Sequence, residues 1–108
     1  MTARDVVSVL AEVARTRGQQ VAQHGRLDHP DSHSPGSHHL YAVRADAYRD
    51  ANLSRRAAGA PDTWDYLILE GVYEALAEPD CDEARRLLVQ ATCVLVAHIE
   101  ALDRRAAV

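Results

Sequence analysis

Three glutamates recur every four residues in the stretch LILEGVYEALAE, at Glu70, Glu74 and Glu78. On a helix this spacing places the carboxylates one turn apart, where neighbours could share a hard cation such as magnesium. The same row could equally be a solvated acidic face. Gly71 lies at the centre of the row, although glycine costs about 1 kcal/mol relative to alanine inside a helix.

Histidine is the second residue type that could carry chemistry, because its charge changes near neutral pH. Five of the six histidines lie in or beside one segment: His24, His29, His33, His38 and His39. Their spacing is not a zinc signature and no cysteine is near, so we expect them to be solvated. His98 falls in an apolar stripe. It is either a core histidine bonded to a carbonyl or carboxylate, or an acid–base group facing Glu70 or Glu74.

Size, charge and hydropathy limit the function classes. A chain of 108 residues is one domain, residues 1–108, and its net charge of -4 gives no bulk attraction for nucleic-acid polymers or anionic lipid. The start lacks the apolar core of a secretion signal. The longest apolar run, Leu87–Ile99, is shorter than the ~20 residues of a membrane span. We therefore expect a cytoplasmic protein with two free cysteine thiols and neither a membrane nor a nucleic acid as partner.

Helical periodicity alternates with glycine and proline along the whole chain, which predicts an all-α fold. The expected helices span residues 2–23 with fraying near Gly18, 38–58, 62–78 and 80–105, and residues 24–37 form a long loop. We expect Ser37, Asp62 and the Asp80–Glu83 pair to cap the last three helices. Leu40, Val43 and Ala47 are expected to face inward. The last helix is apolar on more than one face, which favours a homodimer.

The order of ILEGVYEALAE, EPDCDEAR and LLVQATCVLVAHIEALDRR, preceded by HGRLDHPDSHSPG, resembles the MazG-like all-α nucleotide pyrophosphatases, especially the short actinobacterial and phage proteins. The resemblance covers most of residues 20–105. It implies a four-helix antiparallel bundle that forms a dimer or tetramer. It also implies an E-x-x-E pair and an E-x-x-D pair on consecutive helices, which bind magnesium and cleave a nucleoside triphosphate to monophosphate and pyrophosphate.

Laid on this chain, the first pair falls on Gly71 and Glu74, with Glu70 as the extra glutamate that often precedes it. The second pair falls on Leu87 and Gln90, so one of the four ligand positions keeps a carboxylate. Leucine can neither offset the charge of a triphosphate nor bind magnesium. The departure from the family pattern therefore predicts a changed chemistry.

The expected function is a metal-independent enzyme or binder for a small molecule, such as a cyclase or isomerase of secondary metabolism, with no cofactor. The expected catalytic groups are Glu70, Glu74 and His98. The expected substrate-binding residues are His29, Asp31, Arg44, Tyr73, Leu87 and Gln90. His29 and Asp31 enter this set because the resembling proteins place their His-Pro-Asp loop beside the pocket.

Two alternatives stay open from the sequence. One is a magnesium-dependent nucleoside triphosphate pyrophosphohydrolase with a diminished site made by Glu70, Glu74 and Glu78. The other is a non-catalytic helical dimer that binds a protein partner.

Overall fold

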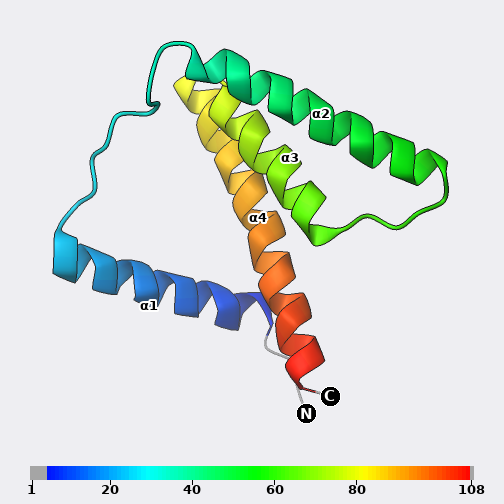
Figure 1. The fold of residues 1–108 in the computed structure, drawn as a ribbon. Helices are drawn as coiled ribbons and strands as arrows, with labels where there is room; N and C mark the ends of the chain where they lie inside the picture. The colour runs from blue at the N-terminus through cyan, green and yellow to red at the C-terminus, as the bar shows by residue number, and fades with distance from the viewer. Residues whose placement is uncertain (1–4, 108) are drawn as a thin grey trace. The chain divides into compact units, whose positions relative to one another are not determined.

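The computed structural model describes residues 5–107, which contain four helices and no strand (Figure 1). The helices are α1 (Val6–His24), α2 (Ser37–Ala57), α3 (Trp64–Ala77) and α4 (Cys81–Ala106). The predicted all-α class is confirmed, and the elements lie within a few residues of their predicted bounds. The predicted start of the first helix, at Thr2, lies outside the described residues.

Local hydrogen bonds and one glycine set the bounds of α1. The Asp5 carboxylate accepts from the Ser8 amide at 2.9 Å and caps the start of the helix. The helix runs through Gly18, so the predicted fraying there was wrong. It ends where Gly25 takes a φ of 71°, a backbone conformation that favours glycine.

Two of the predicted caps were wrong because each side chain has another partner. Ser37 is the first residue of α2, and its hydroxyl accepts from the Ser34 amide at 3.2 Å. Asp62 does not cap α3, which begins after Thr63, and instead accepts from the Arg56 Nε at 2.9 Å. Neither competing bond is visible in the local sequence pattern.

The predicted capping box at the start of α4 is half formed. Asp80 Oδ2 accepts from the Glu83 amide at 2.9 Å, as predicted. The Asp80 amide, however, donates to Glu78 Oε1 at 3.1 Å, while the Glu83 carboxylate pairs with Arg86. The third glutamate of the acidic row therefore helps to shape the α3–α4 turn.

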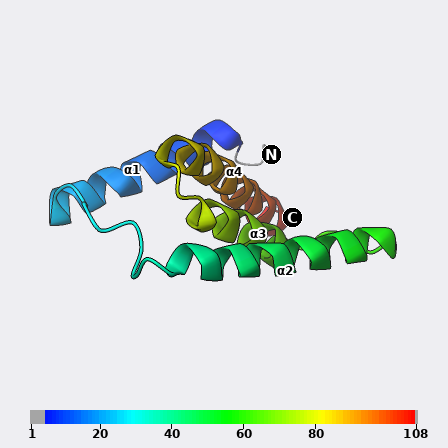
Figure 2. The ribbon, with the colours of Figure 1, turned by 90° about the horizontal axis from the view of Figure 1, so that it is seen from above.

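Two compact units make up the chain, Ser32–Leu95 and Met1–Asp31 with Val96–Val108. In the first of these, α3 lies alongside α2 and the first part of α4 (Figures 1 and 2). The buried apolar residues of this unit are Ala45, Ala75, Leu87 and Ala91. In the other unit, which holds α1 and the end of α4, Val9 and Val96 are buried.

The buried face of α2 differs from the predicted one. Leu40 and Val43 were expected to face inward, but they are 47% and 54% exposed. Ala45 and Asn52 are buried instead, at 3% and 1%. Helix α2 thus approaches α3 through a small residue and a polar one, a choice that hydrophobic periodicity does not indicate.

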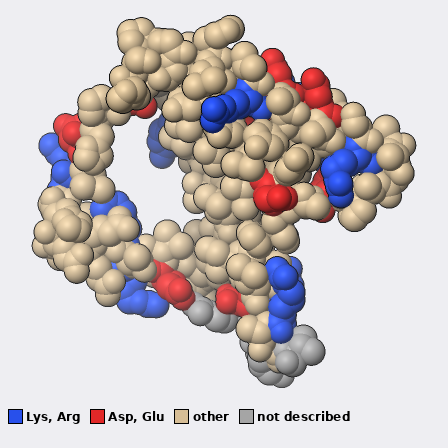
Figure 3. All heavy atoms as spheres, viewed as in Figure 1, with Lys and Arg blue, Asp and Glu red and all other residues tan. Residues whose placement is uncertain are grey.

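The surface carries charged side chains together with many large apolar ones. On the face shown in Figure 3, acidic and basic side chains are interspersed. Cys81 and Cys93 are exposed free thiols, as expected. Within the described part of the chain, no helix has the length and apolar character needed to cross a membrane.

Candidate functional site

A cavity of about 210 Å³ lies between α3 and the first part of α4. Leu67, Glu70, Gly71 and Glu74 line it from α3, and Leu87, Gln90, Ala91 and Val94 line it from α4. The structure thus brings together four of the site residues predicted from the sequence: Glu70, Glu74, Leu87 and Gln90. Two carboxylates and an amide provide its polar groups, and aliphatic side chains provide the remaining surface.

Gly71 on α3 faces Ala91 on α4. A Cβ atom built on it would lie 3.6 Å from the Ala91 Cβ, an ordinary van der Waals distance. Its φ is not positive, so the backbone does not require glycine here. Because Gly71 lines the cavity, a long side chain at this position would extend from the α3 wall and reduce the cavity volume.

Glu70 is held by a residue that the sequence analysis missed. The Asn52 amide nitrogen on α2 donates to Glu70 Oε1 at 2.7 Å and lies 3.4 Å from the Tyr66 carbonyl oxygen. Asn52 is 1% exposed, and its own amide oxygen has no partner. The sequence carried no signal for Asn52, because hydrophobic periodicity predicted a different buried face of α2; only the packing shows a buried amide that needs a partner.

The charges of both cavity carboxylates act at longer range on two arginines. The pKa of Arg86 is raised, first by its hydrogen bond to Glu83 and to a smaller extent by the charge of Glu74. The pKa of Arg56 is likewise raised, chiefly by its hydrogen bond to Asp62 and slightly by Glu70. Both guanidinium groups are exposed, so solvent screens these effects.

Arg44 and Tyr73 meet in the seam between α2 and α3, and neither lines the cavity. Arg44 Nη1 donates to the Tyr73 hydroxyl at 3.1 Å, and its guanidinium lies 5.6 Å from the centre of the Tyr73 ring. Tyr41 and Tyr48 each stack on Tyr73 with ring centres 5.8 Å apart. Through these contacts, Arg44 and Tyr73 join α2 to α3.

The remaining predicted site residues belong to the other unit. His29 and Asp31 are exposed in the segment between α1 and α2. His98 is half-buried on the last part of α4. None of the three is among the residues that line the cavity, so their roles toward a substrate stay predictions.

The cavity residues do not suit a magnesium ion with a triphosphate. Glu70 and Glu74 are its carboxylates, and the facing positions on α4 offer an aliphatic side chain and an amide. Glu78 does not line the cavity, and its carboxylate accepts from the Asp80 amide. Within residues 5–107, no three histidine, cysteine, aspartate or glutamate side chains come together to hold a metal ion.

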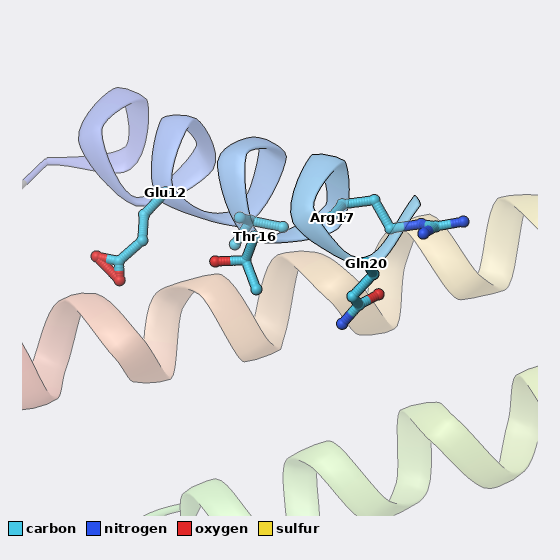
Figure 4. Close-up of a pocket in the computed structure, with 5 residues that line it drawn as sticks. Glu12, Thr16, Arg17 and Gln20 are labelled. Atoms are coloured by element: carbon cyan, nitrogen blue, oxygen red, sulfur yellow. The ribbon is translucent and has the colours of Figure 1, made fainter. Parts of the chain in front are cut away.

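A second hollow, of about 300 Å³, lies along one face of α1. Its lining residues are Glu12, Val13, Thr16, Arg17 and Gln20. In Figure 4 the Glu12 and Arg17 side chains point toward opposite ends of this helix. The polar groups therefore do not converge on one point, which makes the α3–α4 cavity the better candidate site.

No family model, curated protein or solved structure matches this chain.

Proposed function

We propose that the chain is a MazG-like scaffold reused as a metal-independent enzyme or binder for a small molecule. One observation carries the proposal: Glu70, Gly71, Glu74, Leu87 and Gln90 line a single cavity. These are the positions at which the resemblance expects the magnesium ligands and the glutamate that precedes them. The arrangement keeps two carboxylates and replaces the others by glycine, leucine and an amide.

The chemistry that suits this cavity is proton transfer on a compact, weakly charged substrate. Its volume of about 210 Å³ lies below the roughly 300–1,000 Å³ of sites for drug-sized ligands. A positioned carboxylate contributes about 10²–10⁴-fold as a general acid or base. Cyclisation, isomerisation or elimination in secondary metabolism fits these properties, with the Glu70 and Glu74 carboxylates as the groups of the cavity that act on the substrate.

A ligand panel tests the proposal directly. Thermal unfolding is followed with small apolar metabolites and with nucleoside triphosphates, each with and without millimolar magnesium. A ligand that binds the native state raises the unfolding temperature by mass action. We expect a metabolite to do so without magnesium. Magnesium-dependent pyrophosphate release from a nucleotide, lost in Glu74→Gln, would instead support the pyrophosphohydrolase alternative.

Restoring carboxylates tests the origin of the scaffold. The triple variant Gly71→Glu, Leu87→Glu, Gln90→Asp places oxygen ligands at the positions given by the resemblance. We expect it to bind magnesium by calorimetry, whereas the wild type does not. The control variant Gly71→Gln, Leu87→Gln, Gln90→Asn has nearly the same shape without the charge. Equal magnesium binding by both variants would contradict the proposal.

We also propose that the working form is a homodimer. Leu88 and Leu95 lie seven residues apart on one face of α4 and are 48% and 41% exposed. A pair of half-exposed leucines at this spacing is typical of a helix face covered by another helix. The small buried core of each unit supports the same conclusion, because small domains gain stability by association.

A further inference from the structure

The geometry points to a division of roles between the two cavity carboxylates: Glu70 is the general base, and Asn52 is the residue that positions it. This inference rests on the proposed function, since it concerns the same cavity. It adds a residue on α2 that neither the sequence pattern nor the cavity lining indicates.

The hydrogen bond from Asn52 restrains one oxygen of Glu70. The Asn52 amide nitrogen lies 2.7 Å from Oε1, and Glu70 lines the cavity. A carboxylate has two oxygens, and the bond to Asn52 occupies a lone pair on only one of them. Oε2 is thus available to accept a proton from a substrate, while the bond to Oε1 limits the rotation of the group.

The orientation of the Asn52 amide is itself determined. Its nitrogen faces two acceptors, Glu70 Oε1 and the Tyr66 carbonyl oxygen. The reversed amide would place an oxygen against both acceptors and lose both bonds. The observed orientation leaves the Asn52 oxygen buried without a partner, which is unfavourable. Such an unpaired oxygen lowers the stability of a small core. Losses of stability of this kind are found at functional positions.

Glu74 has a different environment one turn along α3. It lines the same cavity, but among the described residues no side chain donates a hydrogen bond to it. Beyond the hydrogen bond to Glu83, its negative charge contributes slightly to the raised pKa of Arg86. A carboxylate that no side chain restrains can adjust to bind the substrate, whereas a restrained one is suited to a proton transfer that requires alignment.

A generic substrate can test this assignment before the natural one is known. In 5-nitrobenzisoxazole, a base removes the proton on C3, the C–H electron pair forms the nitrile, and the N–O bond breaks to give a coloured phenolate. The proton passes to Glu70 and then to water. The reaction needs neither an oxidant nor a metal, so its rate reports the base and its alignment.

The first comparison separates the two carboxylates. We expect saturable turnover by the wild-type protein, with kcat reduced about 100-fold in Glu70→Gln. Glu74→Gln should raise KM and change kcat by less than about 3-fold, because it keeps the base. Asp46→Asn is the control, since Asp46 is an exposed carboxylate on α2 paired with Arg49. Loss of turnover in Glu74→Gln but not in Glu70→Gln would overturn the assignment.

The second comparison concerns Asn52. Asn52→Leu keeps the branched shape of the side chain, at a larger volume, without the donor, and we expect kcat to fall about 10-fold at an unchanged KM. Circular dichroism and the unfolding temperature establish that the variant is folded. If it does not fold, Asn52→Ala, which is smaller and has no side-chain donor, replaces it. Full kcat in a folded variant that lacks the amide would overturn the positioning role.

Binding of the probe distinguishes failure of this inference from failure of the proposed function. The methyl resonances of Leu87 and Val94 report occupancy, because both residues line the cavity. Binding without turnover would overturn the assignment of Glu70 as a base and leave the proposed pocket intact. Absence of any shift at saturating probe would contradict the pocket itself.

Discussion

Asn52 on α2 and Glu70 on α3 form a 2.7 Å hydrogen bond, with Asn52 almost fully buried. Replacing the amide by a carboxylate would set two negative charges against each other. We predict that Asn52→Asp lowers the free energy of unfolding at pH 7 by about 3 kcal/mol or more. Asn52→Leu, which removes the donor without adding a charge, should lower it by less than Asn52→Asp does. Urea unfolding measures both, and equal losses in the two variants would show that the charge is not buried.

Gly71 and Gly59 should respond to alanine in opposite directions. Gly71 is helical and has room for a Cβ, so Gly71→Ala should raise the free energy of unfolding by about 0.5–1 kcal/mol. Gly59 has a φ of 78°, so Gly59→Ala should lower it by about 1 kcal/mol. Chemical denaturation of the two variants provides the comparison. A destabilised Gly71→Ala would mean that the helices pack more tightly at this point than the structure shows.

Leu87 and Leu88 are adjacent but differ in burial. Leu87 is 6% exposed and Leu88 is 48% exposed. We predict that Leu87→Ala lowers the free energy of unfolding by about 2–4 kcal/mol and Leu88→Ala by less than about 1 kcal/mol. Both are measured at concentrations where the proposed dimer forms and at high dilution. Leu87→Ala should also enlarge the cavity and admit bulkier ligands. Comparable losses of stability in the two variants at high dilution would contradict the burial of Leu87 and the exposure of Leu88.

The proposed dimer predicts a difference between two exposed apolar surfaces. Leu88→Glu with Leu95→Glu should convert the dimer to a monomer, because charge replaces the apolar contact of α4. Leu53→Glu is the control, since Leu53 is 54% exposed on α2. Light scattering after size exclusion gives the mass. A monomeric wild-type protein at micromolar concentration would contradict the dimer.

The first turn of α4 should weaken in acid. Hydrogen bonds from Arg86 hold the pKa of Glu83 below its ordinary value of 4.5. A carboxylate whose pKa is lowered by folding stabilises the folded state at pH values above its ordinary pKa. This stabilisation is lost as the pH falls through the lower pKa of the folded state. The protection factors for amide exchange in residues 81–86, which are corrected for the intrinsic pH dependence of exchange, should therefore fall below about pH 4.5. Glu83→Gln should reduce this pH dependence, and an unchanged dependence would exclude the Glu83–Arg86 pair as its source.

Helical periodicity predicted the four elements because the sequence punctuates them strongly with glycine and proline. It did not predict side-chain partners or which face of a helix another helix covers. Asp62 looked like a cap, but Arg56 from the end of α2 binds it. Leu40 and Val43 looked buried, but Ala45 and Asn52 take the inner face of α2. The resemblance located Glu70, Glu74, Leu87 and Gln90 on two consecutive helices, whereas Asn52 required the packing of a third.

The stacked rings of Tyr41, Tyr73 and Tyr48 give the molecule an internal optical marker. Chromophores held 5.8 Å apart in a fixed orientation couple electronically and produce circular dichroism in the near ultraviolet. Two of these rings are on α2 and the third is on α3, so the coupled signal depends on the docking of these two helices. A substrate that shifts α3 when it enters the cavity would thus change the spectrum of the unlabelled protein.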